Sequence, residues 1–129
     1  MKNILWYPPL TIFLVSLDWF LKHIFIENFV CNKNIAWNIP VIPGIFYFFW
    51  VIIFFFLLYY FLKSKKYSEK IALVLIISGA ISNMIDRILY SCVVDFINIK
   101  IGPIFNLADV YITIGVAILI IIKILNPKR

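Results

Sequence analysis

The chain of 129 residues has room for one domain. Hydrophobic residues make up 64% of it and charged residues only 14%, whereas a soluble domain has about 45–50% apolar and about 25% charged residues. These proportions leave too little polar surface for a soluble protein, so the composition predicts a membrane protein. The formal charge of +6 would suit nucleic acid in another context, but the basic residues lie between apolar runs as topology signals, and no nucleic-acid partner is expected.

Four apolar runs are each close to the length of about 20 residues that a spanning helix needs. They cover residues 4–26, 45–62, 71–89 and 104–125. The first run carries Asp18 and Lys22 in its second half and lacks a small-residue cleavage site, so we interpret it as a retained helix and not as a cleaved signal peptide. The sequence therefore predicts an all-α membrane protein with four transmembrane helices in a single domain spanning residues 1–129.

The charged residues predict the orientation of these helices. Eight of the twelve basic residues flank the runs on one side: Lys2, Lys63, Lys65, Lys66, Lys70, Lys123, Lys128 and Arg129. The positive-inside rule assigns that side, and with it both termini, to the cytoplasm. Five of the six acidic residues lie at the opposite helix ends or in the outer segments: Asp18, Glu27, Asp86, Asp95 and Asp109. We therefore expect the polar chemistry at the outer membrane boundary.

The two outer segments differ in character. Residues 27–44 contain four Asn and two Pro with little helical period, which predicts extended or irregular structure. Residues 90–104 are shorter and begin with a weak alternation typical of a strand. Cys31 and Cys92 lie in these segments, so a disulfide is possible, but we interpret them as two unpaired small hydrophobic residues. With a single His23 and no cluster of ligands, no metal is expected.

Asp95 and Asp109 flank a short turn that contains Gly and Pro. A charge kept at or near a bilayer is costly and is a functional candidate. Two carboxylates within reach of each other do not both ionise easily, so the pair supplies a general acid and a general base at one place. Such a pair can activate water against an amide carbonyl without a metal. The structural alternative is that Asp109 is a charge at a helix N-terminus, near a capping Asn106, and that Asp95 is a solvated loop residue.

Two further charged groups lie near helix ends. Asn83 is one helical turn from Asp86 and Arg87, and we interpret the last two as a boundary ion pair that supports the site. Asp18 and Lys22 have the i, i+4 spacing that favours an ion pair. That pair either holds the helix end or grips a polar substrate backbone or a lipid headgroup.

A polar block lies in the first outer segment, with Asn32, Asn34 and Asn38 surrounding Trp37. The Asn side chains carry donors and acceptors that can bind a peptide, and Trp37 fits an interfacial anchor. A polar loop with an aromatic anchor is the simpler interpretation. The many Phe and Tyr of residues 46–61 are interpreted as lipid-facing or packing side chains.

Taken together, these motifs resemble the lipoprotein signal peptidases, the type II signal peptidases of bacteria. The resemblance spans nearly the whole chain and follows the order of the family's blocks: DWFLK at 18–22, NKNIAWN at 32–38, SGAISNMIDR at 78–87, VVDF at 93–96 and FNLAD at 105–109. The last two blocks match those that carry the family's catalytic aspartates. Some positions depart from the family pattern: Asn34, Asn38, Ser78, Ser82, Val110 and the short loop of 13 residues between the aspartates.

The resemblance implies an aspartic endopeptidase that removes signal peptides from prolipoproteins, cutting just before a diacylglyceryl-modified cysteine. Asp95 and Asp109 would be the catalytic dyad, and a second set would support the site or position substrate: Asn32, Asn83, Asp86, Arg87, Asn106, Asp18 and Lys22. The resemblance also implies a small extended platform and lid outside the membrane and a multi-pass location in the bacterial inner membrane, with the active site on the extracytoplasmic side. We expect no cofactor, contact with membrane lipid and a monomer.

Two functions from other classes are weighed against the peptidase. A small transporter or proton-coupled channel subunit would spread its carboxylates through the membrane depth or show an inverted repeat. Here the carboxylates gather at one boundary and no repeat is visible. A non-catalytic membrane scaffold would tolerate replacement of either aspartate.

Overall fold

The computed structural model describes residues 4–35 and 39–125. Several residues of the sequence analysis lie outside these ranges: Lys2, Trp37, Asn38, Lys128 and Arg129. The predicted interfacial anchor at Trp37 and the basic residues near both termini therefore stay predictions.

Four helices form where the apolar runs predict them: α1 (Tyr7–Ile24), α2 (Pro43–Lys63), α3 (Tyr67–Tyr90) and α4 (Leu107–Leu125). A short 3-10 turn, Ile4–Trp6, precedes α1, and a second one, Ile26–Asn28, follows it. Helices α2, α3 and α4 are long and apolar enough to cross a membrane. Helix α1 is not among them, because its two Pro, Asp18, Lys22 and His23 together lower the mean hydropathy of its 18 residues.

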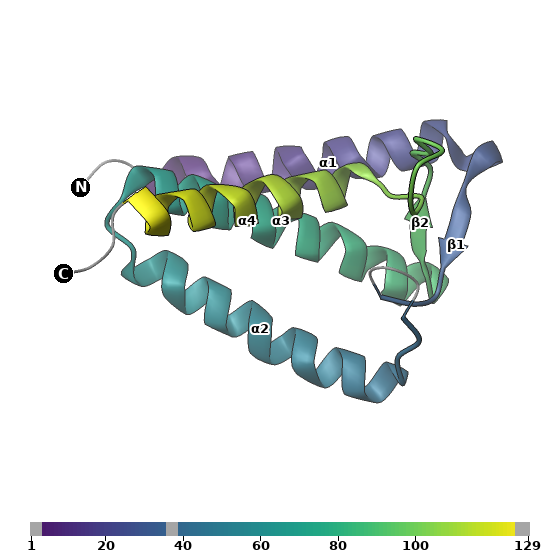
Figure 1. Cartoon of the computed structure of the whole chain (residues 1–129), viewed down its shortest axis with the longest axis horizontal. Coiled ribbons are helices and arrows are strands. Elements are labelled where there is room, and N and C mark those ends of the chain that lie inside the picture. The colour runs from purple at the N-terminus through teal and green to yellow at the C-terminus, as the bar shows by residue number, and fades with distance from the viewer. Residues whose placement is uncertain (1–3, 36–38, 126–129) are drawn as a thin grey trace.

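Helices α1, α3 and α4 lie alongside one another, with α3 the most buried of the three (Figure 1). A short turn connects the end of α2 to the start of α3. From that turn, α2 diverges from the other helices toward the end of the molecule that carries the strands (Figure 1). The core forms near the narrow end of this arrangement, from Tyr7 of α1, Phe61 of α2 and three residues of α3: Leu73, Val74 and Ile77. The wide end is thus left for the polar groups.

Glycines let α3 and α4 approach closely. A Cβ atom at Gly79 would overlap the carbonyl oxygen of Ala108, and one at Gly115 would lie 2.6 Å from the carbonyl oxygen of Ala72. Small residues at such contacts are typical of packed membrane helices. Helix α2 is apolar on all sides, and no residue of its most apolar 18-residue window is buried. This exposure fits the interpretation of its Phe and Tyr side chains as lipid-facing.

A two-stranded antiparallel sheet closes the wide end of the molecule (Figure 1). Strand β1 (Val30–Asn32) pairs with β2 (Val93–Asp95) so that Val30 lies opposite Asp95 and Asn32 opposite Val93. The extended structure predicted for both outer segments is therefore confirmed. Strand β2 is buried, whereas Val30 is 45% exposed.

The interpretation of two unpaired cysteines is wrong. Cys31 and Cys92 form a disulfide, with their Cα atoms 5.4 Å apart. This separation lies in the usual range for a disulfide. The two residues are 61 positions apart in the sequence, and only the pairing of β1 with β2 brings them together. No local pattern in the sequence signals that pairing.

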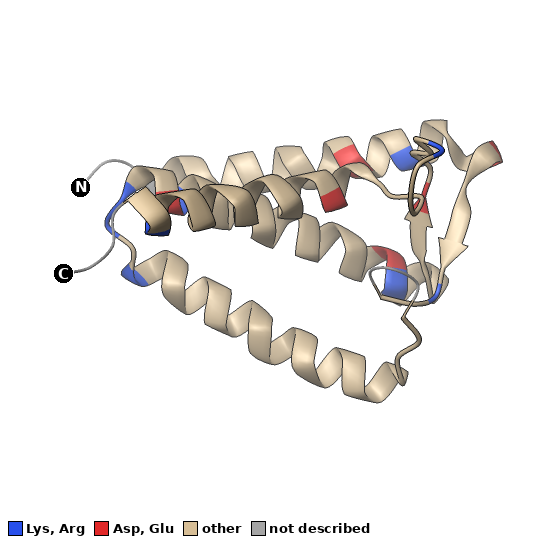
Figure 2. Ribbon diagram, in the orientation of Figure 1, with Lys and Arg blue, Asp and Glu red and all other residues tan. Residues whose placement is uncertain are grey.

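Acidic residues concentrate in the half of the molecule that carries the strands, as Figure 2 shows. Basic residues occupy the opposite end around the turn between α2 and α3, and a few others lie near the strands (Figure 2). At the α2–α3 turn, Glu69 accepts a hydrogen bond from Ser64 at 2.6 Å and lies 3.8 Å from Lys66. This arrangement follows the charge bias predicted from the sequence.

Candidate active site

The Asp95 carboxylate is held at the end of β2 by two amides. Asn32 of β1 donates from Nδ2 to Asp95 Oδ2 at 3.0 Å, and Asn106 donates from Nδ2 to Asp95 Oδ1 at 2.9 Å. The Asn32 amide is itself oriented, because its Oδ1 accepts the backbone N–H of Asn34 at 3.0 Å. Asp95 is only 2% exposed, so it is not the solvated loop residue of the structural alternative.

Burial sets the protonation behaviour of Asp95. Removal from water disfavours the charged carboxylate and, with the negative charge of Asp109 nearby, raises the pKa of Asp95 from 3.8 to about 6. The hydrogen bonds from Asn32 and Asn106 and the charge of Lys22 act in the opposite direction, by stabilising the carboxylate. Desolvation outweighs them.

Asp109 lies in the first turn of α4, where Asn106 is the residue before the helix. The Asn106 side chain accepts the backbone N–H of Asp109 at 2.9 Å, and the Asp109 side chain accepts the backbone N–H of Asn106 at 3.1 Å. This reciprocal pattern is a capping box, and it explains why α4 begins at Leu107, three residues later than predicted. The proposed role of Asp109 as a helix N-terminal charge therefore describes its local geometry correctly.

Asp109 also contacts a residue outside the helix cap, Asn83 of α3. Its Oδ1 accepts a hydrogen bond from Asn83 Nδ2 at 2.9 Å, and Asn83 Oδ1 accepts one from Asn106 Nδ2 at 3.0 Å. Asn106 also donates to Asp95, so one amide is hydrogen-bonded to one carboxylate and caps the helix that carries the other. The two aspartates predicted as a dyad are thus connected through Asn83 and Asn106.

A buried charge cluster lies beneath this network. Lys22 Nζ is 2.6 Å from Asp18 Oδ2 and 2.7 Å from Asp86 Oδ2, and all three side chains are at most 3% exposed. Burial and pairing of Asp18 and Lys22 favour a structural role over contact with a substrate backbone or a lipid headgroup.

Asp18 and Asp86 of this cluster hydrogen-bond to residues next to Asp109 and Asp95. Asp18 accepts the backbone N–H of Ala108 at 2.9 Å and the Ser82 hydroxyl at 2.5 Å, and Asp86 accepts the backbone N–H of Val94 at 3.1 Å. The charges of α1 and α3 therefore fix the residues next to Asp109 and Asp95. Sequence reasoning missed Ser82, whose hydroxyl gave no signal beyond its position one turn after Ser78.

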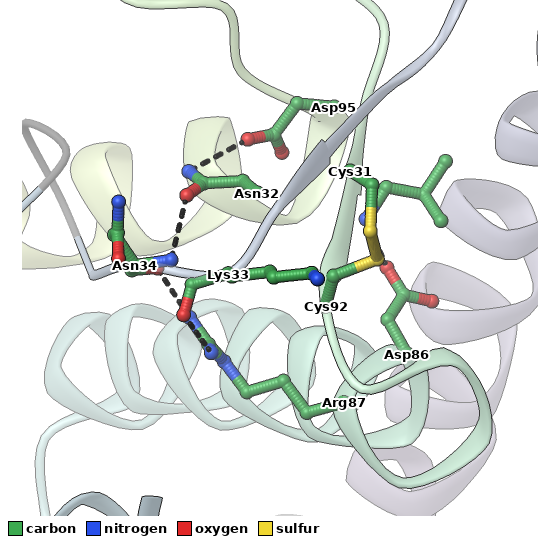
Figure 3. The surroundings of a disulfide bond; sticks show 9 residues. Cys31, Asn32, Lys33, Asn34, Asp86, Arg87, Cys92 and Asp95 are labelled. Atoms are coloured by element: carbon green, nitrogen blue, oxygen red, sulfur yellow. Dashed lines mark hydrogen bonds between the residues drawn. A yellow bond between two sulfur atoms is a disulfide. The ribbon is translucent and has the colours of Figure 1, made fainter. Parts of the chain in front are cut away.

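Arg87 does not pair with Asp86 as predicted. Side chains at i and i+1 leave a helix in different directions, and Asp86 pairs with Lys22 instead. The Arg87 guanidinium reaches the other way, donating to the carbonyl oxygens of Asn34 at 2.7 Å and Lys33 at 3.5 Å (Figure 3). It also lies over the Phe46 ring, 4.4 Å from the centroid. Arg87 thus connects α3 with the outer segment and α2.

A cavity of about 660 Å³ opens beside the two aspartates. Its polar part contains Asp95, Asp109, Asn83 and Asn32, and its apolar walls come from α2, α3 and α4: Phe46, Trp50, Ala80, Met84 and Ile112. A second apolar cavity of about 320 Å³ lies along α2 and shares Phe46 and Trp50 with the first. In the described ranges, no group of three or more His, Cys, Asp or Glu is placed to hold a metal.

Comparison with known proteins identifies the family. The family model for signal peptidase (SPase) II matches residues 10–125 of the chain. The chain belongs to the signal peptidase II family. The family resemblance stated from the sequence is therefore confirmed.

Individual relatives match over shorter segments. The lipoprotein signal peptidase of Caldicellulosiruptor bescii is 53% identical over 57 residues, which are 44% of this chain and 38% of that protein. The one from Photorhabdus laumondii is 41% identical over 70 residues, 51% of this chain and 42% of that protein. The chain thus matches about two-fifths of the length of these curated relatives.

The fold matches solved structures over nearly its full length. A bacterial membrane enzyme determined in meso at 2.3 Å resolution superposes with a TM-score of 0.83 and 30% identity, covering 93% of this chain and 88% of that one. A second one, at 1.9 Å resolution, gives a TM-score of 0.79 with 33% identity, covering 95% and 94%. The fold of the chain is therefore similar to that of two solved bacterial membrane enzymes.

Proposed function

We propose that this chain is an aspartic endopeptidase that removes the signal peptide from diacylglyceryl-modified prolipoproteins, cutting before the lipidated cysteine. The observation that supports it most directly is the connection of Asp95 and Asp109 through Asn106 and Asn83 at the polar end of a large apolar-walled cavity. The other predicted site residues support this dyad: Asn32, Asp86, Arg87, Asp18 and Lys22.

The environments of the two carboxylates support a division of roles. Asp95, with its pKa raised to about 6, holds the proton below about that pH. Asp109, in the first turn of α4, accepts hydrogen bonds from Asn83 and from the backbone N–H of Asn106, and we assign it the role of the base. The ionised Asp109 takes a proton from water, whose oxygen attacks the scissile carbonyl carbon, while protonated Asp95 donates to the carbonyl oxygen. Collapse of the tetrahedral intermediate breaks the C–N bond, and a proton passes to the leaving amine. Peptide hydrolysis by this route uses no cofactor.

The cavity walls suit a lipidated substrate. The scissile amide needs hydrogen-bonding groups, and these lie at the end of the cavity formed by Asp95, Asp109 and Asn83. The diacylglyceryl chains need apolar surface, and Phe46 and Trp50 of α2 line both the main cavity and its apolar neighbour. One substrate would thus place its peptide in the polar end and its lipid along α2 toward the bilayer.

The same proposal includes the membrane topology. Helix α1 would be the fourth span, because its two charges are paired and buried against α3. The basic turn between α2 and α3 would face the cytoplasm together with both termini. The disulfide near the aspartates supports an oxidising, extracytoplasmic location for the other end. The chain would function as a monomeric single domain, residues 1–129, in the bacterial inner membrane.

Cleavage of a diacylglyceryl-modified precursor by the purified chain in detergent tests the function. We expect the native chain to cut, Asp95→Asn and Asp109→Asn to lose cleavage, and a chelator to have no effect. Glu27→Gln is the matched control, because it removes an exposed carboxylate at the same end of the molecule. Failure of the native chain to cut, or full activity of either Asn variant, would contradict the peptidase and favour a transporter or a scaffold.

A further inference from the structure

The two faces of the small sheet line two different cavities. Neighbouring side chains on a strand point to opposite faces, and the register places one set toward the active-site cavity: Asn32, Val93 and Asp95. The other set lines a smaller cavity of about 220 Å³ behind the sheet: Cys31, Cys92 and Val94. The disulfide therefore lies directly behind the hydrogen bond from Asn32 to Asp95.

Both cross-strand links are diagonal. Opposite Asn32 lies Val93, so its partner Asp95 is two residues further along β2. Opposite Cys31 lies Val94, so its partner Cys92 is two residues earlier in the chain, directly before β2. The two diagonals cross, and together they oppose sliding of β1 in either direction. Figure 3 shows the disulfide and the Asn32–Asp95 hydrogen bond connecting the same two strands.

Besides these two links, strand β1 is held by its backbone pairing with β2 and by the hydrogen bonds of Arg87 to the carbonyls of Lys33 and Asn34 directly after it. It is three residues long, and Val30 and Cys31 are exposed. A sheet of two strands is marginal in water on its own, and short exposed strands specify register weakly. Strand β2, in contrast, is buried against α3 and held by the Asp86 carboxylate. The covalent bond thus connects a weakly held strand to a firmly held one.

We propose that the Cys31–Cys92 disulfide positions Asn32 on Asp95 and so makes cleavage sensitive to the thiol–disulfide state of the outer compartment. The proposal rests on the peptidase function proposed above. Neither sulfur touches the substrate cavity, so the two cysteines are positioning residues. Reduction would free β1 from β2, withdraw the Asn32 amide from the Asp95 carboxylate and leave the helices in place.

The redox step balances with a dithiol as reductant. A thiolate of the dithiol attacks one sulfur of the disulfide and releases the other cysteine as a thiol. The second thiol of the reductant then attacks the mixed disulfide and releases the first cysteine. Two electrons and two protons pass to Cys31 and Cys92, and the reductant becomes a disulfide. Cys31 is exposed whereas Cys92 is 1% exposed, so attack occurs at the Cys31 sulfur and Cys92 is the leaving thiol.

A pH profile separates positioning from a merely structural role. The charged groups around Asp95 are Asp109 of α4, Lys22 of α1 and Arg87 of α3, with Asp86 of α3 bonded to the neighbouring residue of β2. None of them is on β1. Loss of the Asn32 hydrogen bond removes an interaction that stabilises the Asp95 carboxylate and raises its pKa. Reduction should therefore move the high-pH limb of kcat/KM to higher pH.

The experiment compares the oxidised chain, the chain reduced with dithiothreitol, the double variant C31S/C92S and Asn32→Ala, each in detergent with the same precursor. Reduction should lower kcat/KM of the native chain by up to about tenfold, the effect of one hydrogen bond, and reoxidation should restore it. The double variant should behave like the reduced chain with or without dithiothreitol. In Asn32→Ala, reduction should change kcat/KM less than twofold, because this variant already lacks the hydrogen bond from Asn32 to Asp95 that reduction would break.

Hydrogen–deuterium exchange provides a readout that does not depend on cleavage. Reduction should increase exchange in residues 30–32 and leave α1 and α3 unchanged. Unchanged kcat/KM and unchanged exchange after verified reduction would overturn the proposal, and so would unfolding of the helices. An oxidised chain that does not cut would refute the peptidase alone, and exchange would then still decide whether the disulfide holds β1.

Discussion

Replacing Asp95 with Asn should stabilise the folded chain while removing its activity. A rise in the pKa of this carboxyl from 3.8 to about 6 means that ionising it costs the folded state about 3 kcal/mol more than the unfolded state. Asn carries no charge and avoids that cost. However, the amide of Asn faces two donors, from Asn32 and Asn106, and loses one hydrogen bond worth about 1 kcal/mol. The net expected gain is about 2 kcal/mol at pH 7.5.

The pH dependence distinguishes this cause from others. The folded state binds the Asp95 proton more tightly than the unfolded state, so protonation stabilises the fold, and this stability is lost as pH rises from 3.8 through 6. The gain of Asp95→Asn should therefore be absent at pH 4, grow up to about pH 6 and stay constant above it.

Unfolding in detergent, followed by Trp fluorescence from pH 4 to 8, measures this difference. Glu27→Gln, with the same change in net charge at an exposed position, should show no comparable gain. If Asp95→Asn destabilises the chain at pH 7.5, or if its effect is the same at pH 4 and pH 7.5, the buried-charge reasoning is wrong.

Three further predictions follow from the site and the helix packing. Asn106→Ala removes the hydrogen bond to Asp95 and the cap of α4, so we expect a fall in kcat of about 100-fold and a loss of about 1 kcal/mol in stability; unchanged kcat would show that Asn106 does not connect the carboxylates. Gly79→Ala should cost about 1–3 kcal/mol, because the new methyl group overlaps a carbonyl of α4, whereas Gly44→Ala meets nothing within 4 Å and should be neutral or slightly stabilising; equal melting temperatures would contradict the close packing. If Asp95 supplies the proton, kcat/KM should fall about tenfold per pH unit above about pH 6; a profile that rises through pH 6 would assign the proton to its partner.

Local patterns predicted the helices and the closest ion pair. The four runs gave the helices within a few residues because apolar composition persists over the whole length of each span. The Asp18–Lys22 pair followed from its i, i+4 spacing. The start of α4 was placed too early, since Ile104 and Phe105 continue the apolar run whereas the capping box at Asn106 decides where the helix begins.

Contacts between distant segments could not be predicted in this way. Lys22 pairs with Asp86, 64 positions later, and this contact displaced the expected pair of Asp86 with Arg87. The disulfide and the Asn32–Asp95 hydrogen bond depend on a strand pairing that three-residue strands do not signal. The residue pattern marked Asp95 and Asp109 as candidates, whereas their connection through Asn83 and Asn106 required the packing of α3 against α4.

The contact of Asp18 with α4 has a consequence for synthesis of the chain. Asp18 is synthesised early, with the first helix. Its Oδ1 atom, however, accepts a hydrogen bond from the backbone N–H of Ala108, which lies 90 residues later in the chain. Lys22 likewise pairs with Asp86, which is synthesised later. During insertion, the first helix therefore holds a charged pair whose partners have not yet been made, and the arrangement becomes complete only when the last helix enters the membrane. Premature termination before α4 should leave a chain that quality-control proteases remove rapidly.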